Sequence, residues 1–512
     1  MPVSRSLRTL RIFETALAAL VLAVLGFGAV VASWRHGWLL YYGDAQAHLN
    51  IARRILDSRT PGYEQIGTVW LPLPHLLALG WATDDAWWRS GLAGSLPSAV
   101  CFVIAGTLLF AAARRIFSSS AAAFAAALLF ALNPNLLYLQ STAMTETIFF
   151  AALCALLYAT VRFSESQSWW TVALAGAAAV AAALTRYEGW FLIPFATLFF
   201  LIAARRHRLA VAAIFGALAA SAPLYWLAHN WWLYGDPLEF YRGPYSAKVI
   251  YETALAGGMQ PYAGDHDWAK AWLYFRSAVA LTAGRPLLWI GAAGLAVCLL
   301  RRWWWPALLL ALPPVFYLWS IHSGGTPIFV PQLWPFTYYN TRYGLAALPL
   351  LALAGGALAA TTPARFRAVA AVAVVAAAVV PWLVAPRPQE WICWRESQVN
   401  SEARRAWTGQ AAEYLRTHYR GGGILTSFGD LTGIFREAGI PLRETLHQGN
   451  VPYWEGAVAR PDLLLHEEWA VAISGDKVSG AMLKAARRGP SYNCVKIIAV
   501  KGAPVIEIYK RN

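Results

Sequence analysis

Charged residues are scarce in this sequence. They make up 13% of the 512 residues, whereas soluble domains carry about 25%. Hydrophobic residues make up 58% of the chain, and nearly uncharged stretches of about 18 or more residues recur. Each such stretch can cross a bilayer core of about 30 Å. The shortage of charge argues against a soluble protein and predicts a polytopic α-helical membrane protein.

Acidic residues are scarcer than basic ones, and the formal net charge is +15. A basic chain can bind nucleic acid, but the arginines here occupy alternate short connections between apolar stretches. That alternation is the positive-inside pattern. It argues against a nucleic-acid partner and places the N-terminus in the cytoplasm. The arginines are Arg5, Arg8, Arg11, Arg114, Arg115, Arg162, Arg205, Arg206, Arg208, Arg301, Arg302, Arg365 and Arg367.

The apolar stretches predict about 11 transmembrane helices. The first is interpreted as a retained span, because its apolar run is longer than that of a usual signal peptide. An odd number of spans places the C-terminus outside and every arginine-rich turn inside. The predicted spans are 12–33, 92–113, 120–138, 142–161, 169–184, 189–204, 208–228, 285–300, 303–321, 342–360 and 367–386.

Charge density rises after about residue 390, and strand patterns appear at 423–428, 496–500 and 505–509. We expect two domains. Residues 1–386 form the transmembrane domain, whose first external loop, 34–91, carries surface helices. Residues 387–512 form a small extracytoplasmic α/β domain.

Cysteine is also scarce, with five residues in the chain. Cys101, Cys154 and Cys298 fall inside predicted spans, where we expect them only to pack. Cys393 and Cys494 lie outside the spans, one near each end of the C-terminal domain. Because an oxidising compartment allows thiols to pair, we expect a Cys393–Cys494 disulfide.

The first external loop places Asp44 directly after the first span. The apolar residues of 45–56 recur at helical spacing, which predicts a helix along the membrane surface. Asp44 can be read as a helix cap or as a carboxylate poised to take a proton. His48 lies four residues later, a spacing compatible with two ligands of a metal ion. A third ligand is not evident, so a divalent metal stays an open alternative.

Further polar residues lie at the predicted outer ends of the spans. Charged groups near a bilayer are usually paired or functional. An ordinary turn with an arginine that snorkels to headgroups is the alternative for 185–188. The candidates for substrate binding are Glu146, Arg186, Tyr187, Glu188, Arg342 and Tyr343.

Several short motifs occur in a characteristic order: Gly43-Asp44, Trp70-Leu71-Pro72-Leu73-Pro74, Ser95-Leu96-Pro97-Ser98, Asn133-Pro134 followed by Glu146, and Thr185-Arg186-Tyr187-Glu188. Over about residues 10–360, the chain resembles the GT-C superfamily of membrane glycosyltransferases. The similarity is to bacterial relatives of protein O-mannosyltransferases and aminoarabinose transferases.

The resemblance implies transfer of a sugar from a polyprenyl-phosphate donor to an acceptor hydroxyl, with inversion. It makes Asp44 the catalytic base. Arg186 and Arg342 are then candidates for the donor phosphate, and Glu146, Tyr187, Glu188, His48 and Tyr343 for substrate contacts. The mannosyltransferases carry an Asp-Glu pair where this sequence has Asp44-Ala45, which leaves the handling of the acceptor in doubt.

Three other functions stay open. A transporter or flippase of a lipid-linked sugar would use the same residues without chemistry. A membrane scaffold would leave Asp44 unexplained, and an oligosaccharide ligase would transfer a whole glycan. The acceptor (protein, lipid or glycan) is undetermined. We expect an integral protein of the cytoplasmic membrane, with its active site and C-terminal domain outside.

Overall fold

The computed structural model describes residues 5–384 and 390–512, and its contacts divide the chain into two compact units. Unit 1 comprises Met1–His36, Thr68–Pro74 and Leu96–Glu396. Unit 2 comprises Gly37–Gly67, His75–Ser95 and Ser397–Asn512. Most of the predicted first external loop therefore packs with the C-terminal residues. The predicted domain boundary at 386/387 lies outside the described residues and stays a prediction.

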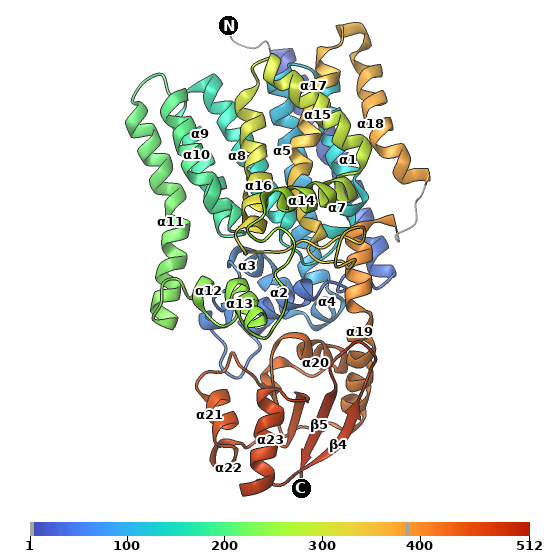
Figure 1. Ribbon diagram of the computed structural model, residues 1–512. Helices are drawn as coiled ribbons and strands as arrows, with labels where there is room; N and C mark the ends of the chain where they lie inside the picture. The colour runs from blue at the N-terminus through green and yellow to red at the C-terminus, as the bar shows by residue number, and fades with distance from the viewer. Residues whose placement is uncertain (1–4, 385–389) are drawn as a thin grey trace. The chain divides into compact units, whose positions relative to one another are not determined.

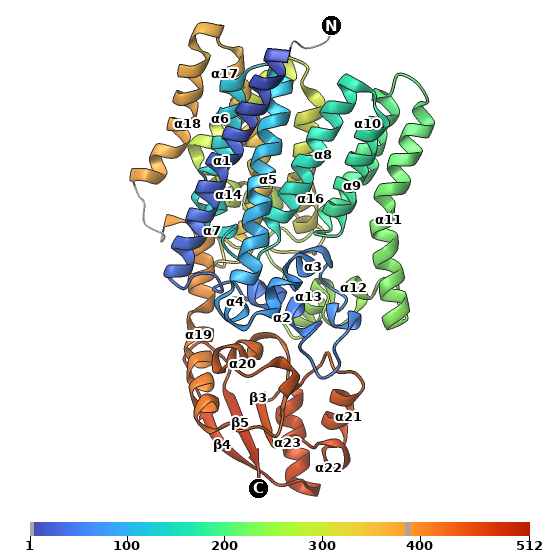
Figure 2. The same cartoon turned by 180° about the vertical axis from the view of Figure 1, so that it is seen from behind.

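Unit 1 is a bundle of helices (Figures 1 and 2). Its helices are α1 (Arg5–Arg35), α5 (Leu92–Phe117), α6 (Ser120–Ala131), α7 (Pro134–Leu139), α8 (Glu146–Ser166), α9 (Trp169–Ala183), α10 (Glu188–Ala203), α11 (Arg208–Tyr234), α12 (Glu239–Arg242), α13 (Ala247–Ala256), α14 (Trp268–Ala283), α15 (Arg285–Leu300), α16 (Trp304–His322), α17 (Leu348–Thr361) and α18 (Arg367–Val384). The 3-10 helices η3 (Thr341–Ala347) and η4 (Ala364–Phe366) precede α17 and α18.

The predicted class, a polytopic helical membrane protein with a small C-terminal α/β part, is confirmed. The count of about 11 spans is not. Among the described residues, 7 helices are long and apolar enough to cross a membrane, or 8 if α14 and α15 count as one broken span. The axes of α14 and α15 differ by 108°. Three more apolar helices, α6, α9 and α10, have only 10–17 residues.

Helix α17 is the central helix of unit 1: with η3 it has 89% of its apolar window buried, against 11% for α18. Small residues allow this packing. A Cβ atom at Gly294 of α15 would lie 1.9 Å from the carbonyl oxygen of Ala354, and one at Gly356 would lie 2.7 Å from that of Ala122 in α6. Such close backbone approach is typical of membrane helix interfaces. Because η3 directly precedes α17, the close packing of α17 also fixes the position of η3 within the bundle.

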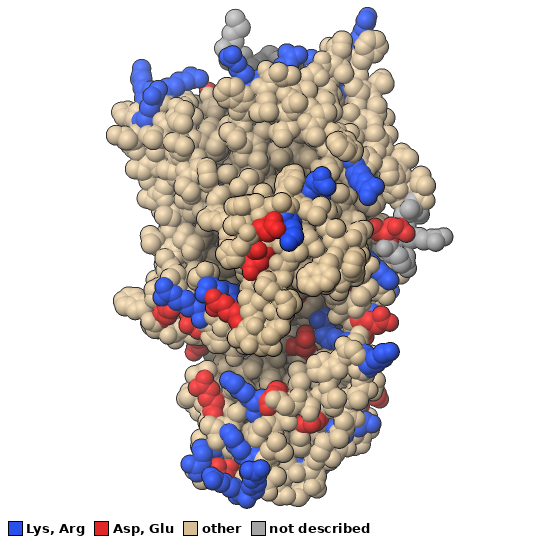
Figure 3. All heavy atoms as spheres, viewed as in Figure 1, with Lys and Arg blue, Asp and Glu red and all other residues tan. Residues whose placement is uncertain are grey.

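The surface of unit 1 reflects its composition. Figure 3 shows a broad zone of mostly uncharged residues over the helices, with Lys and Arg gathered at the bundle end where the N-terminus lies. Arginines in the last turn of α5 and at the α15–α16 connection fit this pattern. The distribution is typical of a membrane protein whose helix ends meet charged headgroups.

Unit 2 contains a five-stranded sheet of order β2-β1-β3-β5-β4. The first three strands of that order are parallel, and β5 is antiparallel to both of its neighbours. The strands are β1 (Ile424–Thr426), β2 (Thr445–Leu446), β3 (Trp469–Ile473), β4 (Tyr492–Ile498) and β5 (Ile506–Arg511). The three strands predicted from sequence are β1, β4 and β5, whereas β2 and β3 were missed.

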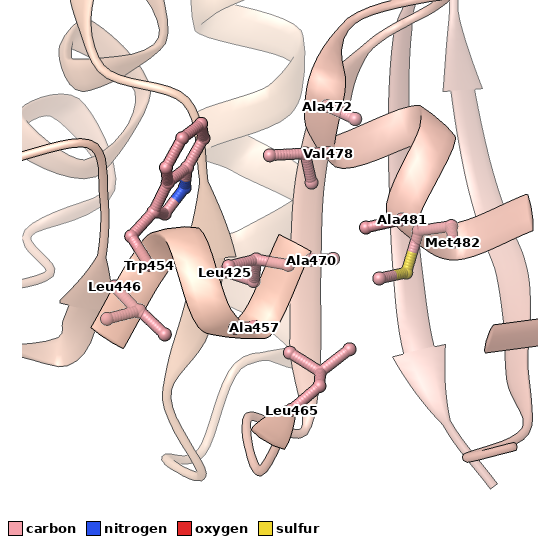
Figure 4. Close-up of a cluster of buried hydrophobic side chains, with 10 residues drawn as sticks. All are labelled: Leu425, Leu446, Trp454, Ala457, Leu465, Ala470, Ala472, Val478, Ala481 and Met482. Carbon is pink, nitrogen blue, oxygen red and sulfur yellow. The ribbon is translucent and has the colours of Figure 1, made fainter. Parts of the chain in front are cut away.

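Helices complete unit 2: α2 (Gly43–Arg54), α3 (Leu73–Leu79), α4 (Asp85–Ser90), α19 (Ile392–His418), α20 (Thr432–Ala438), α21 (Tyr453–Ala459), α22 (Pro461–Leu464) and α23 (Lys477–Arg488), with 3-10 helices η1 (Tyr63–Ile66), η2 (Trp81–Thr83), η6 (Gly429–Leu431) and η7 (Leu442–Glu444). Helices α3 and α19 begin in unit 1 and continue in unit 2. One hydrophobic core lies between the sheet and helices α21 and α23, with Leu425, Trp454, Ala470 and Met482 among its residues (Figure 4).

The predicted Cys393–Cys494 disulfide stays a prediction. Cys393 is fully buried near the start of α19, where its backbone N–H donates to Asn135 Oδ1 at 2.9 Å. Cys494 is exposed on β4.

Candidate active site

Glu146 is the first residue of α8, and it is buried. Its Oε1 accepts hydrogen bonds from Nη1 of Arg186 and from Nε of Arg342, both at 3.2 Å. Arg186 lies in the turn between α9 and α10, and Arg342 lies in η3. One carboxylate oxygen therefore draws together two guanidinium groups from distant parts of the chain.

Glu188 and Tyr317 complete the surroundings of Arg186. Nε of Arg186 donates to Glu188 Oε1 at 2.7 Å. The hydroxyl of Tyr317, on α16, accepts from Nη2 of Arg186 and donates to the same glutamate oxygen. Nη1 also donates to Thr145 Oγ1 at 2.6 Å. These bonds fix the plane of the guanidinium group before any ligand arrives, which is the preorganisation that binding of a planar anion requires.

Arg342 is held from a second side by Glu396, which lies near the start of α19. Glu396 Oε1 lies 3.4 Å from Nη1 of Arg342. Its Oε2 accepts from the backbone N–H of Thr341 at 2.7 Å and from the Thr341 hydroxyl. Asn135 anchors the start of α19 through Cys393 and donates to the carbonyl of Thr282 at 3.0 Å. The place of Glu396 is thus set by the bundle itself.

Tyr343 joins the two arginines. Its ring centroid lies 5.5 Å from Cζ of Arg186 and 4.9 Å from Cζ of Arg342, and the ring stacks on Tyr317 at 4.5 Å. An aromatic face attracts a cation through its quadrupole. The two guanidinium groups are consequently positioned both by carboxylates and by one aromatic ring.

The cluster contains three carboxylates and two guanidinium groups. Carboxylates are therefore in excess by one when all are ionised. Oε2 of Glu146 is buried and has no hydrogen-bond partner among the described residues. A buried acceptor without a donor is unfavourable. A ligand hydroxyl could satisfy Glu146, while the neighbouring guanidinium groups could hold an anion.

Tyr187 lies outside this cluster, although it is next to Arg186 in sequence. Its hydroxyl donates to the carbonyl of Val69 at 2.8 Å, and its ring stacks on Phe240 at 5.2 Å. Tyr187 therefore contacts the 68–74 segment and helix α12. Its predicted role in substrate binding stays a prediction.

Asp44 and His48 lie in unit 2, on α2. Asp44 is half-buried in the first turn, and three residues of the predicted apolar face, Ala45, Leu49 and Ala52, are buried. The fourth, Leu56, lies beyond the end of α2 and is exposed. His48 Nδ1 lies 2.9 Å from His75 Nε2, and both rings are buried. Burial, followed by the charges of His48 and Arg54, holds the pKa of His75 well below 6.5. His75 is thus a neutral partner that orients the His48 ring.

A metal site at Asp44 and His48 would need a third ligand. Within residues 5–384 and 390–512, no three His, Cys, Asp or Glu side chains are grouped so as to hold a metal ion. The hydrogen bond between His48 and His75 occupies one nitrogen of each ring. A divalent metal at Asp44 and His48 stays an open alternative.

Five residues predicted from sequence, Glu146, Arg186, Glu188, Arg342 and Tyr343, meet in unit 1. Tyr317 and Glu396 were missed. Glu396 carried a signal: it follows the last apolar span within a tryptophan-rich stretch, a setting like that of Asp44. Tyr317 carried none, because a tyrosine within a long apolar run is typical of a membrane helix.

The fold and the cluster define a polytopic membrane protein with buried ion pairs at its helix ends. The resemblance to the GT-C superfamily is confirmed by two comparisons. Residues 88–231 match the family model for dolichyl-phosphate-mannose-protein mannosyltransferases. The crystal structure of ArnT from Cupriavidus metallidurans bound to undecaprenyl phosphate has a similar fold, with a TM-score of 0.56 and 15% identity over 94% of this chain and 97% of that chain.

The same ArnT in the apo state gives a TM-score of 0.56 at 14% identity, with the same coverage. The apo oligosaccharyltransferase of Archaeoglobus fulgidus gives a TM-score of 0.48 at 16% identity, over 90% of this chain and 69% of that one. No curated protein sequence matches the chain.

Proposed function

We propose that this protein is a glycosyltransferase that moves a sugar from a polyprenyl-phosphate-linked donor to an acceptor hydroxyl, with inversion at the anomeric carbon. The observation that carries the proposal is the pair of preoriented arginines, Arg186 and Arg342, within a fold shared with ArnT. That the relative was crystallised with undecaprenyl phosphate supports a polyprenyl-phosphate donor.

The chemistry requires few groups. A lipid phosphate leaves readily, so a single carboxylate can take the acceptor proton as the hydroxyl attacks. We assign that base to Asp44. The departing phosphate gains negative charge, and guanidinium groups stabilise it through charge-assisted hydrogen bonds. We assign that role to Arg186 and Arg342, and the binding of a sugar hydroxyl to the unpartnered Oε2 of Glu146.

We further propose that the N-terminus is cytoplasmic, and that the active site and the C-terminal residues lie on the outer side of the cytoplasmic membrane. The arginines at the N-terminal end of the bundle support this orientation through the positive-inside rule (Figure 3).

The test uses the purified full-length protein in nanodiscs, a panel of radiolabelled polyprenyl-phosphate monosaccharides and a candidate acceptor. Wild type should consume at least one donor. Asp44→Asn should slow transfer by about 100-fold or more while still binding the donor. Arg186→Ala should weaken binding of undecaprenyl phosphate. Normal transfer by Asp44→Asn would refute the assignment of the base.

A flippase is the competing function. In proteoliposomes it would move the donor across the bilayer chemically unchanged, and Asp44→Asn would leave that movement intact. Hydrolysis of the donor in the absence of acceptor would favour the transferase, since a flippase breaks no glycosidic bond. An oligosaccharide ligase would use a lipid-linked glycan and leave lipid-linked monosaccharides unconsumed.

A further inference from the structure

The segment that carries Asp44 is built into unit 2 together with the C-terminal sheet. Asn50 of α2 donates to Thr432 Oγ1 at 2.7 Å, and Gln65 donates to the carbonyl of Gly449 at 2.7 Å. Asn450 donates to Ser58 Oγ at 2.9 Å. Asn50 and Asn450 are fully buried. The C-terminal residues are thus part of the immediate surroundings of the helix that begins with Asp44.

These contacts lie beyond the carboxyl ends of strands β1 and β2. Thr432 follows β1, and Gly449 and Asn450 follow β2. The order β2-β1-β3 places β1 between two parallel neighbours: the chain passes from β1 to β2 on one side and then to β3 on the other. The strand order therefore reverses at β1, as it does at a topological switch point. In open α/β sheets, ligands bind beyond the carboxyl ends of the strands at such a point. In this chain, that edge contacts α2.

Two arginines of α19 contact the turn that directly precedes Asp44 in the sequence. Nη2 of Arg404 donates to the carbonyl of Tyr41 at 2.7 Å, and a Cβ atom at Gly43 would lie 2.5 Å from Nη1 of Arg404. Cζ of Arg405 lies 4.0 Å from the centroid of the Tyr41 ring. Both guanidinium groups therefore contact the 41–43 turn.

The positive charge of these arginines is poorly compensated. The nearest carboxylate oxygen to Arg404 is Asp430 Oδ1, at 3.4 Å on a side chain that is 60% exposed. Nε of Arg404 is buried and has no partner among the described residues. Arg405 donates to Ser401 Oγ at 3.1 Å, and no carboxylate within the described ranges lies within 4.0 Å of it. Two guanidinium groups beside a carboxylate base form a place for an anion.

We propose that Arg404 and Arg405 bind an anionic group of the acceptor, a phosphate or a carboxylate, and so present its hydroxyl to Asp44. This assignment rests on the proposed function. Arginine suits it because its planar fork pairs with two oxygens of such a group at once. The acceptor class that follows is an anionic, hydroxyl-bearing molecule. A neutral sugar or peptide hydroxyl would supply no negative charge to Arg405, and it would leave Arg404 with only the exposed carboxylate of Asp430.

The experiment uses the full chain in detergent and two probes. Inorganic pyrophosphate stands for the acceptor anion, and undecaprenyl phosphate for the donor. Binding of each is measured by calorimetry for wild type, for Arg404→Gln with Arg405→Gln, and for the matched control Arg487→Gln with Arg488→Gln on the exposed end of α23. The first double variant should weaken pyrophosphate binding about tenfold or more. Its affinity for undecaprenyl phosphate and both affinities of the control should stay within about threefold of wild type.

Other outcomes overturn the proposal. Unchanged pyrophosphate binding in the Arg404 and Arg405 variant would show that the two arginines only fasten α19 to the 41–43 turn. An equal loss of undecaprenyl phosphate binding would assign the anion site to the donor. Arg405→Gln alone removes no bond to the backbone, so it tests the site if the double variant misfolds; it should weaken pyrophosphate binding about threefold. Failure of the proposed function appears separately, as a wild type that consumes no donor.

Discussion

Two networks of buried arginine, one in each unit, differ in how completely their polar atoms are satisfied. In unit 2, Arg53 donates to Asp57 at 2.7 Å, to Asp85 at 2.6 Å and to the carbonyls of Ala82 and Thr83. Asp57 accepts in turn from the backbone N–H groups of residues 442 and 443. In unit 1, the Glu146 network has a carboxylate in excess and a buried oxygen without a donor.

The difference separates a structural role from a functional one. Arg53 joins α2 to the residues before α4, and Asp57 joins α2 to η7. Among the described residues, no buried polar atom of Arg53 or Asp57 lacks a hydrogen-bond partner. The unit 1 network keeps two guanidinium groups oriented while leaving an acceptor unsatisfied, which is unfavourable in the empty protein and useful once a ligand donates to it.

The largest effect should come from breaking the closed network. Arg53→Met removes one donor and the buried positive charge from the Asp57 carboxylate, and it removes the side-chain donor of the Ala82 and Thr83 carbonyls. We expect the free energy of unfolding to fall by about 3–5 kcal/mol, measured by denaturant unfolding of the detergent-solubilised protein. Arg487→Met, at the exposed end of α23, is the control and should change it by less than about 0.5 kcal/mol. An Arg53→Met protein of wild-type stability would show that the Arg53 network does not stabilise the fold.

Glu146→Gln tests the open network. The change keeps the shape but removes the negative charge that two arginines share, so each guanidinium group loses one of the carboxylates that position it. Transfer should slow by about 100-fold, with the unfolding midpoint nearly unchanged. Glu165→Gln, near the other end of α8 and paired with arginine at the surface, should retain transfer within about twofold. A Glu146→Gln protein that is less stable than wild type but transfers normally would show that the unit 1 network has a structural role and not a functional one.

The polar interior of unit 2 should also respond to pH. Burial, followed by the charges of Arg54 and Arg59, lowers the pKa of His447 to about 3. An unfolded histidine has a pKa near 6.5, so the unfolded state binds more protons below that pH. The contribution of His447 to stability is complete above about pH 6.5 and is lost progressively toward pH 3.

The measurement is unfolding at pH 7 and pH 5 for wild type and His447→Gln. Wild type should lose about 2 kcal/mol more than the variant between these values. The exposed His418, changed to Gln, is the control and should keep the wild-type pH dependence. An identical pH dependence in His447→Gln and wild type would contradict the assignment.

The smallest effect is expected at Glu396, which supports Arg342 from its second side. Glu396→Gln can still accept from the backbone N–H of Thr341, but it loses its charge toward Arg342. Transfer should slow by about tenfold, and the KM for donor should rise rather than kcat fall, if Arg342 binds the donor phosphate. A fall in kcat with an unchanged KM would show that Arg342 stabilises the transition state and does not contribute to binding of the donor.

Much of unit 1 could be predicted, because apolar length and arginine placement are local properties of the chain. The same reasoning found Glu146, Arg186, Glu188 and Arg342 as polar residues at span ends. It could not find Tyr317, whose hydroxyl matters only through its bonds to Arg186 and Glu188. It also counted about 11 spans, a number that is not confirmed, because it included the apolar stretches of α6, α9 and α10, which form helices of only 10–17 residues.

Unit 2 was harder to predict. The Cys393–Cys494 disulfide stays a prediction. The grouping of α2 with the C-terminal strands was missed because it depends on contacts across hundreds of residues, such as Asn50 with Thr432.

The sequence by itself determined that the chain belongs in a membrane, where its apolar stretches lie and which residues could carry charge at their ends. Hydrophobic transfer acts residue by residue, so composition records it. Only the tertiary structure decided which carboxylate holds which arginine, which buried oxygen stays unsatisfied, and that the C-terminal sheet packs around the helix of Asp44. Those choices depend on distance and desolvation, which sequence order does not encode.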